Sequence, residues 1–152
     1  MSDLDVSAVR VMFPLEQDQD GYPPYTEEGI WVRPLTDGVG EVLSIPFFVT
    51  GISRGDFISY DTKGNEAQFS ELLSAKGHST LRLIFFQEDA ESQIRNELEQ
   101  MGCEAEAGSI RSLLAIDVPP KASYTAIIGI ITRESKKAVL DYEEACISRE
   151  HK

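Results

Sequence analysis

The first half of the chain alternates short apolar runs with turn signals, a pattern that predicts a β-rich region. Turns are expected at Asp37-Gly38, Gly55-Asp56 and Lys63-Gly64-Asn65. The main strands expected between these turns are Val9 to Leu15, Gly29 to Leu35, Glu41 to Val49, Phe57 to Tyr60 and Ala67 to Leu73. Because Pro46 cannot donate to a ladder, we expect an edge position or a bulge there. The region is best interpreted as a string of five or six strands that form a small β barrel or a bent antiparallel sheet.

From Thr80 onward, the pattern predicts helices as well as strands. Ile94, Leu98 and Met101 recur at spacings of four and three, which indicates a helix from about residue 90 that Gly102 ends. Strands are expected over residues 80–86, 103–107, 110–118 and 139–147, with a second helix over 123–133. This βαββαβ order is the ferredoxin-like arrangement. The expected fold class is therefore α+β, with a β-rich subdomain (1–76) packed on a ferredoxin-like subdomain (77–152) as one compact unit.

The formal net charge of −12 changes the range of expected partners. It argues against nucleic acid or an anionic membrane surface, and it favours a basic protein. The alternative is that the charge only keeps a small protein soluble. No apolar stretch approaches the roughly 20 residues of a membrane span, and the acidic start lacks the features of a secretory signal, so a cytoplasmic location is expected. The oligomeric state cannot be read from the sequence.

Two acidic segments are candidate partner-binding surfaces. The loop over residues 16–25 carries two prolines flanked by two tyrosines, which predicts a rigid segment with aromatic contact area. In the alternative, both tyrosines fold back over the core. The second segment lies near the C-terminus, where strand alternation would put Asp141 and Glu143 on one face, toward solvent or a partner. The candidate residues are Asp18, Asp20, Tyr22 and Tyr25 in the first segment with Glu27 and Glu28 just after it, and Asp141, Glu143 and Glu144 in the second segment.

Candidate catalytic chemistry is sparse. Gly51 to Gly55 mimics a nucleophile elbow centred on Ser53, but an expected strand follows where an elbow needs a helix. A polar site could gather Asp56, His78, Ser79 and Arg82 from neighbouring turns; in the alternative, these residues shape turns and pair within the sheet.

No cofactor or metal is expected. The two cysteines are far apart in the chain, so neither a disulfide scaffold nor a paired-cysteine zinc site is predicted. The two histidines, one of them at an end expected to fray, do not supply a multi-histidine site, and Asp18 and Asp20 lack the rest of a calcium loop. The sequence also lacks a phosphate-binding loop and a dinucleotide fingerprint.

Three short segments carry a family resemblance. They are Ile-Pro-Phe-Phe at residues 45–48, Gly-x-Ser-x-Gly-Asp at 51–56 and Gly-His-Ser-Thr-x-Arg at 77–82. With these segments in this order, the chain resembles an uncharacterised bacterial domain-of-unknown-function family from Val9 to Ile147, including the segment from Leu140 to Cys146. The resemblance implies a recurring bacterial module and supplies no activity.

Small size, acidity and sparse catalytic machinery together favour a non-enzymatic, partner-binding protein. The most concrete hypothesis is an immunity-type inhibitor that covers the active site of a basic bacterial toxin or nuclease. The second hypothesis is a small-ligand sensor whose ferredoxin-like half binds a metabolite. The third is a minor enzyme that uses Asp56, His78 and Arg82.

Overall fold

The chain has an α+β fold built from two compact units. The structure, a computed structural model, describes residues 7–152. The first unit ends at Lys76 and the second begins at Gly77. Each unit has its own hydrophobic core.

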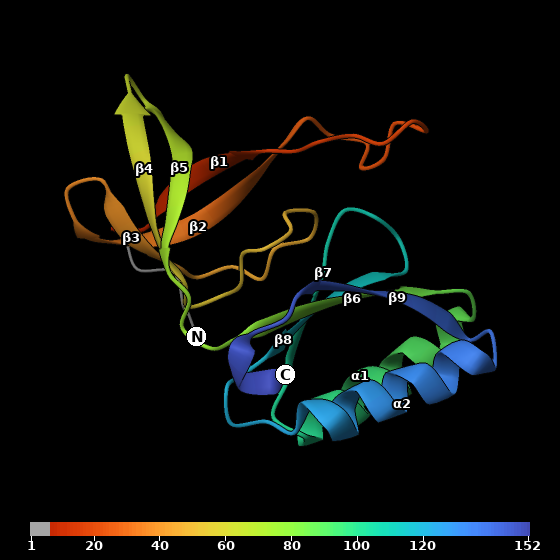
Figure 1. Cartoon of the computed structure of the whole chain (residues 1–152). Helices are drawn as coiled ribbons and strands as arrows, with labels where there is room; N and C mark the ends of the chain where they lie inside the picture. The colour runs from red at the N-terminus through yellow and green to blue at the C-terminus, as the bar shows by residue number, and fades with distance from the viewer. Residues whose placement is uncertain (1–6) are drawn as a thin grey trace. The chain divides into compact units, whose positions relative to one another are not determined.

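The first unit is a closed barrel of five strands (Figure 1). The strands are β1 (Val9–Pro14), β2 (Glu27–Thr36), β3 (Val39–Val42), β4 (Phe57–Lys63) and β5 (Glu66–Ser74). Strands that follow each other in the chain pair antiparallel, and β1 closes the barrel by pairing parallel with β5. The alternation along β1 turns Val11 and Phe13 into the barrel, where they are fully buried. Of the two expected forms, the closed barrel is therefore confirmed.

The expected strand from Glu41 to Val49 is wrong beyond Val42. β3 ends there, and residues 43–56 form an irregular connection in which Pro46 lies outside every strand. The physical reason is that the backbone N–H groups of Phe47, Phe48 and Val49 donate to the carboxylate of Glu28. These donors are therefore not available to a ladder, and the segment has no edge position or bulge at Pro46.

The second unit is a four-stranded antiparallel sheet with both helices on one face (Figure 1). In chain order the strands and helices are β6 (Ser79–Phe85), α1 (Glu91–Gln100), β7 (Glu104–Ala107), β8 (Leu113–Val118), α2 (Tyr124–Lys136) and β9 (Leu140–Cys146). Two short 3₁₀ helices, η1 (Glu88–Ala90) and η2 (Arg149–His151), follow β6 and β9. The sheet order is β7-β8-β6-β9, so β8 lies between β7 and β6.

Local sequence explains where α2 begins and where α1 ends. The Ser123 hydroxyl caps α2 by accepting a hydrogen bond from the N–H of Ala126 at 3.3 Å. Gly102 follows α1 with a φ of +98°, which glycine adopts without a Cβ clash, as predicted for its C-terminal end. Within the described range, neither helix is both long and apolar enough to cross a bilayer.

Candidate functional site

The connection between β1 and β2 contains the acidic loop predicted from the sequence, here called the tyrosine loop (residues 16–25). Its own side chains hold its shape. The Asp18 carboxylate accepts hydrogen bonds from the N–H groups of Asp20 and Tyr22 at 2.8 and 3.0 Å. The side-chain amide of Gln17 donates to the carbonyl of Pro23 at 2.9 Å. A loop ordered in this way loses little conformational entropy when it binds a partner.

Both tyrosines of this loop pack against one phenylalanine. The ring centroid of Phe48 lies 6.3 Å from that of Tyr22 and 5.5 Å from that of Tyr25. Even so, the two tyrosines are 48% and 42% exposed. The structure therefore agrees in part with each expectation. Both rings pack against Phe48 within the protein, and both still expose surface that a partner can contact.

The carboxylates of the first predicted surface have different surroundings. The carboxylate of Glu28 accepts hydrogen bonds from the N–H groups of Phe47, Phe48 and Val49 at 2.7 to 3.0 Å. This carboxylate is therefore already bound by backbone groups of the same chain. Asp20 and Glu27 are exposed, and neither carboxylate has a hydrogen bond or ion pair with another described residue. The acidic groups offered to a partner are therefore those of Asp20 and Glu27.

A hollow of about 490 Å³ lies at the end of the barrel next to Phe48. We call it the aromatic groove. It is lined by Phe13, Pro14, Leu15, Glu16, Phe48, Val49, Thr50, Ile52 and Phe69. The rings of Phe13 and Phe69 stack at 4.4 Å in its wall. The groove offers an apolar depression that adjoins the support of both tyrosines.

The second predicted acidic surface is divided between the two faces of β9, an edge strand. Register pairs Glu143 with Arg82 and Glu144 with Leu81, so the two glutamates point to opposite sides of the sheet. Glu143 accepts from Arg82 Nε at 2.8 Å, and Glu144 accepts from the Tyr124 hydroxyl at 2.9 Å. Asp141 shares the face of Glu143 by strand alternation.

The four residues of the predicted polar site each have their own partners. Asp56 lies in a turn of the first unit, where its carboxylate accepts from the N–H groups of Ser53 and Lys76 at 2.9 and 3.1 Å. Ser53 is fully buried and strand β4 follows the turn, so the segment is not a nucleophile elbow.

In the second unit, His78 Nδ1 lies 2.8 Å from the carboxylate of Asp117. Ser79 and Arg82 follow His78 in the chain, but Ser79 bonds to His151 and Arg82 to Glu143.

The C-terminal His151 is an ordered part of the second unit, so its expected place at a frayed end is wrong. Its Nδ1 lies 2.6 Å from Ser79 Oγ, its Nε2 lies 3.0 Å from the carbonyl of Pro119, and its ring stacks on Tyr124. Ser79 Oγ also accepts from the N–H of Ser148 at 2.8 Å and is fully buried. A catalytic nucleophile must be accessible to its substrate, and the buried hydroxyl of Ser79 is not. The contact between Ser79 and His151 therefore holds the segment after β9 in place.

The sequence did not indicate that Asp117 is the partner of His78 or that His151 is the partner of Ser79. Register places Asp117 opposite Thr80, one residue beyond Ser79, and this pairing depends on which strands are neighbours. The available signal for an ordered end was Ser148, whose side chain caps η2 by accepting from the N–H of Glu150 at 3.1 Å.

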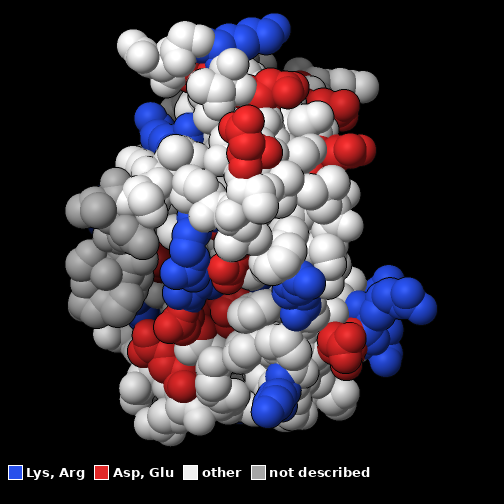
Figure 2. All heavy atoms as spheres, turned by 90° about the vertical axis from the view of Figure 1, so that its left-hand side faces the viewer, with Lys and Arg blue, Asp and Glu red and all other residues white. Residues whose placement is uncertain are grey.

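Charge is mixed on the face that Figure 2 shows, where groups of acidic side chains alternate with basic ones. The net charge of −12 is therefore not a uniform acidic field over this face. Across residues 7–152, no group of three or more histidine, cysteine, aspartate or glutamate side chains is placed to hold a metal ion.

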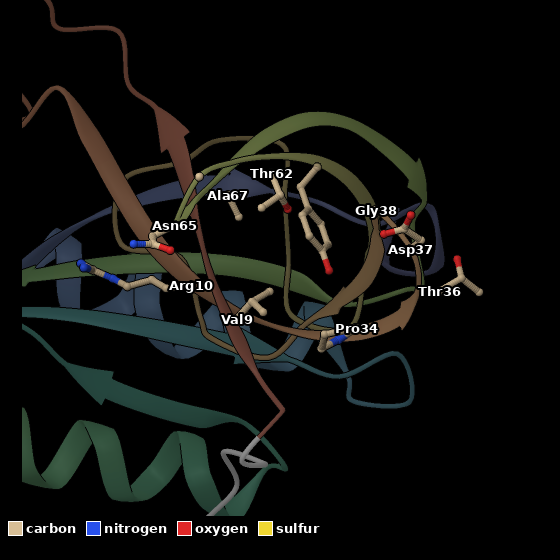
Figure 3. Close-up of a pocket in the computed structure, with 11 residues that line it drawn as sticks. Val9, Arg10, Pro34, Thr36, Asp37, Gly38, Thr62, Asn65 and Ala67 are labelled. Carbon is tan, nitrogen blue, oxygen red and sulfur yellow. The ribbon is translucent and has the colours of Figure 1, made fainter.

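The barrel has a second hollow, of about 530 Å³, at the end formed by its hairpins (Figure 3). We call it the hairpin cavity. It is lined by Val9, Arg10, Pro34, Thr36, Asp37, Gly38, Tyr60, Thr62, Gly64, Asn65 and Ala67. The tyrosine loop joins the opposite ends of β1 and β2, so the two features lie at different ends of the barrel.

Comparison with known proteins gives a match to a family of unknown function and a likeness to a solved structure. Residues 28–142 match the model of a family described as Domain of unknown function (DUF4265). A solved structure titled "Novel crystal structure of a hypothetical protein from Neisseria gonorrhoeae" is similar with a TM-score of 0.77 and 20% identity, over 93% of this chain and 95% of that one. At this identity the likeness concerns the fold. Comparison with curated proteins gives no significant match.

Proposed function

We propose a function for this chain, which belongs to the domain-of-unknown-function family DUF4265, from the geometry of its tyrosine loop. The proposed function is non-enzymatic binding of a basic protein, as an immunity-type inhibitor of a bacterial toxin or nuclease. Two features of one surface carry the proposal. Tyr22 and Tyr25 are half-exposed and both pack against Phe48. The exposed carboxylates of Asp20 and Glu27, close to them in the chain, have no hydrogen bond or ion pair with another described residue.

Each part of this surface has a distinct role in binding. Tyrosines contribute large contact area at low entropic cost and are enriched among residues that dominate binding energy. The aromatic groove next to Phe48 accommodates an apolar side chain of the partner. Asp20 and Glu27 attract basic residues around that contact and accelerate the encounter. The surface therefore suits a partner with an apolar anchor surrounded by lysine or arginine.

The test compares two variants with the same net charge. Asp20→Lys with Glu27→Lys reverses the proposed surface, and Asp61→Lys with Asp89→Lys reverses two exposed acids elsewhere. Each reversal adds two charges, so both variants change the formal charge from −12 to −8. Wild type and both variants, each tagged, are used to capture proteins from cells of the source organism. Association rates of the captured partner are then measured at low and high salt.

The proposal predicts a stoichiometric basic protein that wild type and the Asp61/Asp89 variant retain. The Asp20/Glu27 variant should associate about tenfold more slowly and with a weaker dependence on salt. Equal kinetics for the two variants, or no basic protein that distinguishes them, would remove the tyrosine loop as the binding surface. Circular dichroism confirms that each variant is folded.

We also propose that the second unit has the ferredoxin-like fold. Its order is βαββαβ, and β8 separates β6 from β7, so the first βαβ element is split by an inserted strand. Cross-strand NOEs from Leu81 to both Ile116 and Glu144 would test this arrangement, since register places Leu81 opposite each of them.

One observation favours the second candidate function, small-ligand sensing. The hairpin cavity has a volume within the range of small-molecule sites, roughly 300 to 1,000 Å³. It belongs to the barrel, whereas the sequence hypothesis placed the ligand in the ferredoxin-like half.

The third candidate, an enzyme using Asp56, His78 and Arg82, predicts that His78→Ala loses turnover while it remains folded.

A further inference from the structure

The hairpin cavity has a largely buried tyrosine in its wall. Tyr60, on β4, lines the cavity and is only 8% exposed. Its hydroxyl has no hydrogen-bond partner among residues 7–152. Among the described residues, no buried side-chain nitrogen or oxygen lacks a hydrogen-bond partner, so this hydroxyl is reached by solvent and is accessible to a molecule that enters the cavity.

The charge beside this phenol is negative. Burial raises the pKa of Tyr60, and the nearby carboxylate of Asp37 raises this pKa further. Asp37 lies in the turn between β2 and β3 and has no ion pair with any residue of the described range. A carboxylate without a counter-ion next to an aromatic ring is an arrangement that attracts cations.

The one basic residue among those that line the cavity does not neutralise Asp37. In Figure 3, Arg10 and Asn65 lie on one side of the opening, and Asp37 with Thr36 and Gly38 lies on the other. The Arg10 side chain extends away from Asp37 and covers Gly29, where an added Cβ would collide with its guanidinium group.

We propose that the hairpin cavity binds a free small organic cation, an amine or a guanidine. The Asp37 carboxylate balances its charge, the Tyr60 ring covers its apolar part, and the threonine hydroxyls of the lining accept hydrogen bonds. The volume of about 530 Å³ suits a compact ligand. This site is independent of the proposed partner surface, because the tyrosine loop belongs to the other end of the barrel.

The experiment is a titration of the ¹⁵N-labelled full chain followed by NMR. The probes are choline and methylguanidinium, with 3,3-dimethylbutan-1-ol as the neutral counterpart of choline and acetate as an anion. Both cations should produce saturable shifts at the amides of Gly38, Tyr60 and Thr62. The alcohol and acetate should not. Shifts of the same size with the neutral alcohol, or no saturable shift with either cation, would overturn the proposal.

Three substitutions test the location of the site. Asp37→Asn keeps the shape of the turn residue and should weaken cation binding at least about fivefold, since it removes the balancing charge. Asp61→Asn removes the same charge from an exposed position on β4 that does not line the cavity, and binding should stay within about twofold. Tyr60→Phe keeps the ring and removes the hydroxyl, so it should retain most of the affinity for choline. Equal binding by wild type and Asp37→Asn would refute the assignment of the site, whether or not the tyrosine loop binds a protein.

Discussion

Ser79 and His151 are separated by 72 positions in the chain, yet Ser79 Oγ lies 2.6 Å from His151 Nδ1. The same hydroxyl accepts from the N–H of Ser148, so one buried side chain at the start of β6 holds the segment that follows β9. The stacking of His151 on Tyr124 adds a contact with the first turn of α2. The C-terminal residues are therefore part of the packing of the second unit.

Ser79→Ala should destabilise the second unit by about 1 to 3 kcal/mol, because it leaves the partly buried N–H of Ser148 and an imidazole nitrogen of His151 without their partner. Urea unfolding followed by circular dichroism at 222 nm reports this unit, since both α helices belong to it. Ser92→Ala, at an exposed position of α1, is the matched control and should change stability by less than about 0.5 kcal/mol. An equal, small effect of the two substitutions would show that the Ser79 contact does not stabilise the fold.

Glu28→Ala should destabilise the barrel by about 2 to 3 kcal/mol, because three backbone N–H groups lose a charged acceptor together. Trp31 is the only tryptophan and lies on β2, so its fluorescence reports unfolding of the first unit. Glu27→Ala removes the neighbouring, exposed carboxylate and should have an effect below about 0.5 kcal/mol. If Glu27→Ala were as harmful as Glu28→Ala, the hydrogen bonds to residues 47–49 would not be the cause.

The contrast between Glu27 and Glu28 shows which features of the fold and of the site can be predicted from the sequence. Adjacent in the chain, they were both predicted as partner-binding residues. The hydrogen bonds of Glu28 reach residues 19 to 21 positions away, along a connection that the apolar run after the Asp37-Gly38 turn predicts as a strand. Nothing in the local pattern indicates that a side chain takes the place of a ladder.

Predictions that depend on nearby residues were more successful. Asp37-Gly38 forms a turn because Gly38 adopts a φ of +74°, and the apolar spacing of Ile94 and Leu98 places both on the buried face of α1. By contrast, the pairing of His78 with Asp117 spans 39 positions and depends on β6 and β8 being neighbours in the sheet. Long-range polar partners of this kind are decided by topology, which spacing alone does not provide.

The two cysteines should differ in their reactivity toward alkylating reagents. Cys103 is buried, and burial, with a smaller effect from Asp117, raises its pKa to about 12, so it stays a thiol near pH 8. Cys146 is partly accessible on β9. Iodoacetamide at pH 8 should therefore modify Cys146 in the folded protein and Cys103 only in denaturant, as mass spectrometry can measure. In Cys146→Ser, rapid modification of the folded protein would contradict the burial of Cys103.

Glu134 should make the stability of the second unit depend on pH at the acid end. Its hydrogen bond with Arg133 at 2.6 Å, together with Lys137 at 3.5 Å, lowers the pKa of this carboxyl in the folded state. A carboxyl with a lowered pKa contributes its stability above the pKa of the unfolded chain, and this contribution is lost as the pH falls through the folded value.

Wild type should therefore be more stable than Glu134→Gln at pH 7, and the difference should close below about pH 4. Urea unfolding at pH 7 and at pH 3, followed by circular dichroism at 222 nm, measures this difference in stability. Glu106→Gln, which removes an exposed carboxylate of β7, is the control and should unfold at nearly the wild-type urea concentration at pH 7. A difference between wild type and Glu134→Gln that persists unchanged at pH 3 would mean that the size or packing of the side chain, rather than its charge, is responsible.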